Sequence, residues 1–364
     1  MPDSPRPVPR RALLGAGALA GLAALTTPAH ASVPEDPVEP GPGPTPVPTE
    51  TPKPGFVLWG SSSANSGQPT QYPDGERGTR PKVRIEDVLA PLLGVRGYVT
   101  AIGGEISTQT LRQRSAAHPY RLDFSYANGS GVLPAQGGLV LPTTDRVAPA
   151  WRRVQPAEIS GMDFDHHGLP GTIAGVPCTV QGHPHRFQKV VVTRLTPGEP
   201  VQAGTGTGSW WHTAYEEMHR GRVHLIWTGK NNIVMPDRVI ADTRAIHGVE
   251  PQTSVVMGHW YAWADQPGTA TRAAVDRVNA SYRAEYGPRY FDTMAALRSR
   301  ELWALPELKA YDVGYTAADK DWLARGLPPR QLVSYTDKMH LNALGNRLIA
   351  HALHRFLTGS AGLY

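Results

Sequence analysis

The sequence predicts an α/β fold with a mostly parallel sheet, into which a β-rich segment is inserted. Short apolar runs alternate with apolar stripes at helical spacing in two parts of the chain, residues 55–114 and 209–364. Such alternation is typical of parallel strands that are joined by crossover helices. Between the two parts, residues 115–208 hold Gly/Pro-rich turns and short β-prone runs without a helical stripe. We therefore expect one α/β domain that is interrupted by a β-rich subdomain.

Residues 1–31 have the pattern of an export signal rather than of a folded domain. Arg10 and Arg11 precede an apolar run at residues 12–25, and Ala29-His30-Ala31 fits a small-x-small cleavage site. The arginine pair is typical of the twin-arginine route, and the run is too short to span a bilayer. We expect a secreted, extracellular protein with no integral membrane segment after cleavage; an uncleaved N-terminal anchor is the alternative.

Residues 32–54 are predicted to form a spacer, because nine of these 23 residues are Pro. Such a segment cannot bury a core and favours an extended polyproline-type conformation. It is either a stalk that holds the domain away from the cell surface or a disordered leader.

Charge and cysteine content limit the possible partners and crosslinks. A formal net charge of +5 over 364 residues gives no support for a nucleic-acid partner. The single cysteine, Cys178, excludes an intramolecular disulfide. Because Cys178 lies in an apolar β run, we expect a buried and inert thiol.

The individual elements follow from apolar runs and their spacing. Strands are predicted at residues 56–59, 97–100, 223–227 and 254–260, each before a polar or Gly-containing turn. Helices are predicted at residues 84–93, at 271–286, where polar Asn279 narrows the stripe, and at 343–357 behind a candidate N-cap, Asn342. In the insertion, residues 138–141, 171–174 and 190–193 are predicted strands, arranged as a small sandwich.

Polar residues follow the predicted strands at the edge where parallel strands share one crevice. Ser62 follows the first strand, Gly104 the second and Asn231 the third. Asp337 and His340 lie on the loop that enters the last helix. A hydroxyl, an imidazole base, a carboxylate that orients the base and amide donors for an oxyanion are the parts of nucleophilic acyl transfer.

Four short blocks carry these residues. They read Gly60-Ser61-Ser62, Gly103-Gly104-Glu105-Ile106-Ser107, Gly229-Lys230-Asn231-Asn232 and Asp337-Lys338-Met339-His340. In these blocks and in their order the sequence resembles the SGNH (GDSL-type) hydrolases, whose blocks include Gly-Asp-Ser, Gly-x-Asn-Asp and Asp-x-x-His. The resemblance covers roughly residues 55–114 and 209–358. It implies a flavodoxin-like, three-layer α/β fold and an esterase or lipase activity.

The resemblance also implies a role for each matching residue. Ser62 would be the nucleophile, and His340 would act first as base and then as acid. Asp337 would orient His340. The N–H groups of Ser62 and Gly104 and the side-chain amide of Asn231 would form the oxyanion hole. Neither a cofactor nor a metal is implied.

Two residues depart from the family pattern, since Ser61 and Asn232 stand where the family has Asp. Neither position carries a proton transfer in the family, so we expect the chemistry to survive with altered geometry or substrate preference. Ser61 and Ser63 are rival nucleophiles by proximity, but only Ser62 matches the block.

Other clusters allow further interpretations. The acidic and histidine residues Asp163, Asp165, His166, His167, His183 and His185 could ligate a divalent metal, although they lack a recognised ligand spacing. Trp210-Trp211 is either a stacking platform for a sugar ring or a buried aromatic pair at the subdomain junction. His259 and Trp260 have no assigned role beyond packing near the crevice.

The sequence thus favours a secreted serine esterase that hydrolyses carboxylic esters through an acyl-enzyme intermediate. We expect an ester with a short acyl group, for which an acylated carbohydrate is a candidate. The alternatives are a lipase for longer acyl chains and a non-catalytic glycan- or cell-wall-binding protein with a relic active site. The insertion leaves and re-enters between the second and third blocks, so we expect it to flank the crevice.

Overall fold

A computed structural model describes residues 53–66, 83–114, 120–121, 132–142, 169–182, 189–202 and 210–364. The chain falls into two units, Met1–Thr51 and Pro52–Tyr364, and every described residue belongs to the second. The predicted export signal, most of the spacer and the Asp/His cluster at residues 163–185 lie outside the described residues. Among the helices that are described, none is long and apolar enough to cross a membrane.

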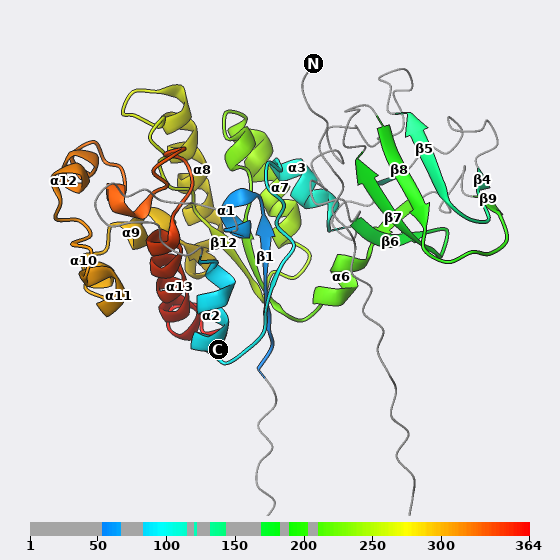
Figure 1. The fold of residues 1–364 in the computed structure, drawn as a ribbon, viewed down its shortest axis with the longest axis horizontal. Coiled ribbons are helices and arrows are strands. Elements are labelled where there is room, and N and C mark those ends of the chain that lie inside the picture. The colour runs from blue at the N-terminus through cyan, green and yellow to red at the C-terminus, as the bar shows by residue number, and fades with distance from the viewer. Residues whose placement is uncertain are drawn as a thin grey trace, which may run out of the picture. The chain divides into compact units, whose positions relative to one another are not determined.

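A five-stranded parallel sheet forms the centre of the α/β part (Figure 1). Its strands are β1 (Phe56–Gly60), β2 (Gly97–Val99), β11 (Val223–Trp227), β12 (Ser254–Met257) and β13 (Tyr290–Phe291). They lie in the order β13-β12-β11-β1-β2, and every neighbouring pair is parallel. Counted along the chain within this sheet, the order is 2-1-3-4-5, which reverses direction between β1 and β11. The predicted α/β fold with a parallel sheet is confirmed.

The strand β1 is apolar on both faces because helices cover both sides of the sheet. Phe56 and Leu58 face one core, and Val57 and Trp59 face the other. On the first face lie α2 (Ile85–Leu93) and α13 (Ala343–Thr358), which pack against each other. On the second face lie α3 (Ser107–Arg112), α7 (Pro236–His247) and α8 (Ala270–Tyr286). The α/β part therefore has three layers.

The three predicted helices are confirmed to within about one residue at each end. Asn342 caps α13, because its Oδ1 accepts hydrogen bonds from the N–H groups of Leu344 and Gly345 at 2.8 and 2.9 Å. Asn279, the polar residue in the stripe of α8, is buried and forms two hydrogen bonds with the backbone of His259. The predicted strand at 254–260 ends earlier, at Met257, and His259 lies in the loop that follows.

Four short helices between β13 and α13 were not predicted: α9 (Thr293–Leu297), α10 (Arg300–Trp303), α11 (Pro306–Lys309) and α12 (Ala317–Ala324). Each has eight residues or fewer, so none shows more than about two turns of a periodic apolar pattern. Side chains from this segment, including Leu302, Trp303 and Trp322, complete the core on the face of α13.

The described part of the insertion is antiparallel β structure, with two sheets. The larger sheet has the order β3-β10-β6-β7-β8-β5, and β4 pairs with β9. The strands are β3 (Tyr120–Arg121), β4 (Val132–Leu133), β5 (Gly138–Pro142), β6 (Leu169–Ile173), β7 (Val176–Gly182), β8 (Lys189–Arg194), β9 (Val201–Gln202) and β10 (Trp210–Thr213). The three predicted strands fall in β5, β6 and β8. The sandwich arrangement stays a prediction.

The boundary of the insertion differs from the predicted one at residue 208. The strand β10 pairs with β3 and β6, so Trp210 and Trp211 belong to the sheet of the insertion. The chain then returns through α6 (Ala214–His219). The side chains of Trp210 and Trp211 lie outside what the structure describes, so both interpretations of this pair stay predictions.

Cys178 lies on β7 with no exposed surface, as expected. Burial raises the pKa of its thiol to about 11, and the opposing effect of Arg194 is smaller. The thiol therefore stays protonated and unreactive at neutral pH.

A buried cluster holds both ends of the insertion together. Arg114, which follows α3, has its Nε 3.6 Å from Glu216 Oε2 in α6 and its Nη2 3.3 Å from Glu250 Oε2. Its Nη1 lies 3.2 Å from Nδ1 of His224, and its guanidinium lies over the ring of Trp59. Burial, and next the charge of Arg114, lowers the pKa of His224 to about 3, so this histidine is neutral.

The chain leaves the α/β part after Arg114 and returns to it at α6, and we call these two places the roots of the insertion. The cluster places both roots at the amino edge of the sheet. His224 is the second residue of β11, and Glu250 lies in the loop that leads to β12. The helix α3 starts at the carboxyl edge and carries the chain to the amino edge before the insertion leaves. We expected the insertion to flank the crevice. Its roots do not, because they lie at the amino edge of the sheet, whereas Ser62 lies at the carboxyl edge.

Candidate active site

Ser62 stands at a sharp turn between β1 and the short helix α1 (Ser62–Asn65). The turn requires Gly60, whose φ is +144° and where an added Cβ would lie 2.0 Å from the carbonyl oxygen of Trp227. Ser62 is the first residue of α1, so its backbone N–H has no partner within the helix. The turn thus presents both the hydroxyl and the N–H of Ser62 at the carboxyl edge of the sheet.

His340 connects Ser62 with Asp337. Its Nε2 lies 2.7 Å from Ser62 Oγ, across 278 residues of sequence, and its Nδ1 lies 2.7 Å from Asp337 Oδ2. When Nδ1–H donates to the carboxylate, Nε2 is left as an acceptor for the hydroxyl hydrogen of Ser62. Within the described residues, neither Ser61 nor Ser63 makes such a contact with His340.

Asp337 is ionised at neutral pH. Burial alone would raise its pKa, but the hydrogen bond from the His340 ring opposes this, and the N–H groups of His340 and Met339 add to the opposition. Together they hold the pKa of Asp337 well below its usual value of 3.8. A fixed carboxylate of this kind orients the imidazole and stabilises the imidazolium that forms in acyl transfer.

The loop that carries Asp337 and His340 is closed by backbone hydrogen bonds. Ser334 N–H donates to the carbonyl of His340 at 2.7 Å, and Lys338 N–H donates to the carbonyl of Ser334 at 3.1 Å. Lys338 has a left-handed conformation, with φ of 55°, which turns the chain between Asp337 and His340. This turn brings the side chains of Asp337 and His340, three residues apart in the sequence, within hydrogen-bond distance of each other.

The second block lies beside the first. Ile102 N–H donates to the carbonyl of Gly60 at 3.1 Å, and Asn65 Nδ2 donates to the carbonyl of Ala101 at 2.8 Å. The chain then turns at Gly104, which is exposed and has a φ of +85°. These contacts bring the Gly104 turn to the side of the strand-to-helix turn that holds Ser62.

The third block is tied to the second. Asn231 Nδ2 donates a hydrogen bond of 2.7 Å to the carbonyl of Glu105, the residue after Gly104. The structure thus joins Ser62, His340 and Asp337 in one chain of hydrogen bonds, and joins Asn231 to the Gly104 turn. In the described part of the chain no hydrogen bond links Asn231 or Gly104 directly to Ser62.

Asn232, one of the two departures from the family pattern, is a buried structural residue. Its Oδ1 accepts from the N–H of Ser107 and its Nδ2 donates to Ser107 Oγ, both at 3.0 Å. Ser107 Oγ–H in turn donates to Asp242 Oδ2 of α7 at 2.7 Å. Because that hydroxyl gives its hydrogen to Asp242, it needs a donor on its other side. An amide at position 232 supplies this donor and an ionised carboxylate does not.

Sequence reasoning missed a buried ion pair in the third block. Lys230 Nζ lies 2.7 Å from Asp265 Oδ2 and donates to the carbonyl of Trp260 at 3.1 Å. Trp263 N–H donates to the carbonyl of Lys338 at 3.0 Å, so the loop after β12 connects the third block with the His340 loop. The position of a lysine inside the third block was the one signal in the sequence that could have suggested an acidic partner there.

His259, which had no assigned role, lies near this ion pair and is completely buried. Burial, and next the charge of Lys230, lowers the pKa of His259 to about 3. His259 is therefore neutral, which agrees with the expectation that it only packs near the crevice.

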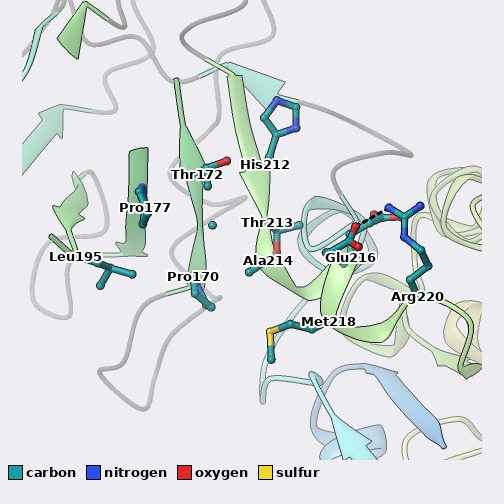
Figure 2. Close-up of a pocket in the computed structure, with 12 residues that line it drawn as sticks. Pro170, Thr172, Pro177, Leu195, His212, Thr213, Ala214, Glu216, Met218 and Arg220 are labelled. Atoms are coloured by element: carbon teal, nitrogen blue, oxygen red, sulfur yellow. Dashed lines mark hydrogen bonds and ion pairs between the residues drawn. The ribbon is translucent and has the colours of Figure 1, made fainter. Parts of the chain in front are cut away.

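A separate cavity of about 820 Å³ opens at the root of the insertion (Figure 2). It is lined by Pro170, Gly171, Thr172, Pro177, Leu195, His212, Thr213, Ala214, Glu216, Glu217, Met218 and Arg220. Figure 2 shows Pro177 and Leu195 on the side of the insertion and Arg220, directly after α6, across from them. None of the candidate catalytic residues lines it, so this cavity is distinct from the site around Ser62.

A scan against models of protein families gives no match for this chain, and a search of the curated proteins gives none either. Within the described residues, no group of three or more His, Cys, Asp or Glu side chains is placed to hold a metal ion.

Proposed function

We propose that the protein is a secreted serine esterase of the SGNH (GDSL) type, which hydrolyses carboxylic esters. The observation that carries the proposal is the hydrogen-bonded series Ser62, His340 and Asp337, with 2.7 Å at both steps. The strand order 2-1-3-4-5, which is the flavodoxin-like order, supports the family. Ser62 lies after β1 and Asn231 lies after β11, where the strand order reverses and ligands bind in such sheets.

The reaction follows from the proposed roles. As Ser62 Oγ attacks the ester carbonyl, His340 Nε2 takes the hydroxyl proton, and Asp337 stabilises the imidazolium. The N–H groups of Ser62 and Gly104 and the side-chain amide of Asn231 stabilise the oxyanion. Collapse of the tetrahedral intermediate releases the alcohol, which receives the proton from His340 Nε2. Water, activated by His340, then hydrolyses the acyl-enzyme and releases the carboxylic acid.

The substrate is proposed to be an ester with a short acyl group, and an acylated carbohydrate is the candidate carrier. Export through the twin-arginine route is part of the same proposal, supported by Arg10, Arg11 and the apolar run behind them. A protein that folds before export needs no disulfide, which agrees with the single cysteine.

The test compares hydrolysis of p-nitrophenyl acetate and p-nitrophenyl octanoate by the mature chain. We expect wild type to prefer acetate and Ser62→Ala to lower kcat by about a thousandfold or more. Ser63→Ala, the matched control one residue away, keeps wild-type activity. A preference for octanoate would favour the lipase alternative, and folded wild type without hydrolysis would favour the non-catalytic binding protein.

A further inference from the structure

Glu105 is a carboxyl group that is buried without a cation beside it among the described side chains. Its side chain has no exposed surface. Gln113 Nε2 lies 3.0 and 2.9 Å from its two carboxyl oxygens, and Thr110 Oγ1 lies 3.4 Å from Oε2. An ionised carboxylate in such a place would be an unpaired buried charge, which is strongly unfavourable.

Three cations with described side chains on the elements around Glu105 are paired elsewhere. Arg114, after α3, pairs with Glu216 and Glu250; Lys230, in the third block, pairs with Asp265; and Arg238 pairs with Asp242 on α7. Within the described residues, none of them forms an ion pair or hydrogen bond with the Glu105 carboxyl.

A second observation concerns Gln113, whose Oε1 is buried and has no donor within the described part of the chain. An ionised Glu105 has only acceptors and cannot supply this hydrogen, whereas a protonated carboxyl carries one O–H donor. The orientation of a Gln amide is assigned from its hydrogen-bond network. With the Gln113 amide turned accordingly, its Oε1 takes the place that lies 3.0 and 2.9 Å from the two carboxyl oxygens and accepts the hydrogen of the protonated carboxyl. Burial also raises the pKa of Glu105 well above its usual value, against the weaker effects of Gln113 and Thr110.

The backbone of Glu105 lies at the proposed oxyanion hole. Its carbonyl accepts the 2.7 Å hydrogen bond from Asn231 Nδ2, and its neighbour Gly104 supplies the proposed N–H donor. Its partner Thr110 also lies 2.8 Å, Oγ1 to Oγ1, from Thr228, three residues before Asn231. The side chain of Glu105 thus anchors the residue whose carbonyl holds the Asn231 amide.

We propose that Glu105 is protonated in the folded protein and acts as a positioning residue for the oxyanion hole. Its neutral carboxyl, paired with Gln113, fixes the turn that orients the Gly104 N–H and the Asn231 amide. The positioning role rests on the proposed esterase function, whereas the protonation does not.

Unfolding measurements test the protonation. In the unfolded chain Glu105 ionises near 4.5, while in the folded protein it keeps its proton to higher pH. The wild type therefore loses stability as pH rises above that value, and Glu105→Gln, which mimics the neutral carboxyl, does not. We expect the variant to melt a few degrees above wild type near pH 8, with the difference closing toward about pH 4.

Glu217→Gln is the matched control for this comparison, because its side chain is 76% exposed. It removes one carboxylate elsewhere, and we expect no such pH-dependent difference. A Glu105→Gln variant that melts below wild type near pH 8, or by an amount independent of pH, would overturn the protonation.

Kinetics on an ester substrate test the positioning role. Glu105→Ala removes the anchor, so we expect kcat to fall by about tenfold to a hundredfold while KM changes little. Glu105→Gln restores kcat to within about threefold of wild type. A purely structural role would change the folded fraction but leave kcat per titrated active site at the wild-type value. Folded Glu105→Ala with wild-type kcat would therefore contradict the proposal.

Gln113→Ala replaces Glu105→Ala if that variant does not fold, since it removes the same pair from the other side. The same loss of kcat is expected, and a wild-type kcat would refute the role. If wild type hydrolyses no ester, the proposed function fails, but the unfolding comparison still decides whether Glu105 is protonated.

Discussion

Lys230 and Asp265 form a buried ion pair beside the proposed oxyanion hole, with Nζ 2.7 Å from Oδ2. Their side chains are 10% and 5% exposed. Because Lys230 also donates to the carbonyl of Trp260, the pair fixes the loop after β12 against the residue next to Asn231. This loop also contacts the backbone at Lys338, so one ion pair influences both halves of the candidate site.

Asp265→Asn should strongly destabilise the protein, because it leaves the Lys230 ammonium buried without its counter-charge. Breaking a buried pair from one side costs about 3–5 kcal/mol. Urea unfolding of the variant measures this loss. Asp237→Asn is the control, since it breaks the exposed pair with Arg277 and should cost less than about 1 kcal/mol. Equal losses in the two variants would contradict the importance of the buried pair.

Asn232→Asp, which restores the residue of the family pattern, should destabilise this chain near neutral pH. The new carboxylate cannot donate to Ser107 Oγ, whose hydrogen is already given to Asp242, so two buried carboxylates compete for one hydroxyl. The expected cost is about 1–3 kcal/mol by urea unfolding. The pKa of the new carboxyl would be raised, so the cost should shrink as pH falls. A fully stable variant near pH 7 would contradict the assigned hydrogen bonds.

Asp337→Asn should lower kcat by about a hundredfold to ten-thousandfold with little change in KM. The amide favours the wrong tautomer of His340, so that an N–H rather than a lone pair faces Ser62. The variant should also change the pH dependence of stability. Because the folded pKa of Asp337 is depressed, its contribution is present above 3.8 and is lost as pH falls below that value. Melting curves of wild type and variant should therefore converge in acid; a difference that grows in acid would contradict this account.

Removal of the insertion should leave the site around Ser62 intact, since both roots lie at the opposite edge of the sheet. A variant in which a short Gly/Ser linker joins Arg114 to Thr213 keeps the contact between Arg114 and Glu216. We expect it to fold and to hydrolyse p-nitrophenyl acetate at a rate within about threefold of wild type. Loss of this activity in a folded variant would place part of the insertion at the site after all.

The sequence predicted the fold best where burial is continuous. Buried parallel strands such as β1 and β11 are uninterrupted apolar runs, and long helices such as α13 show a full stripe, so both were located to within about two residues. The helix α7 was missed because polar Asp242 and Thr243 lie on its buried side, where they bind partners from α3 and α8. Residues 210–213 were assigned to the α/β domain rather than to the insertion, because the pairing of β10 with β6 is set by tertiary structure.

In the candidate site, the sequence identified the residues that stand in a motif, but it did not identify the residues that hold them in place. Ser62, Asp337 and His340 stand in recognisable blocks, and the structure brings them into contact. Glu105 stands in the second block without an assigned role, and Asp265 belongs to no block. Their significance depends on burial and on partners such as Asn231, which is 126 residues away from Glu105 in the sequence. Local patterns carry no information on such contacts.

Covalent labelling of the serine tests the central claim most directly. A fluorophosphonate reacts with a serine hydroxyl only where a base and an oxyanion hole activate it. We expect the folded wild type to be labelled at Ser62, as located by peptide mass spectrometry, and Ser62→Ala to remain unlabelled. Absence of labelling in the folded wild type, or labelling at Ser61 or Ser63 instead, would contradict the proposed site.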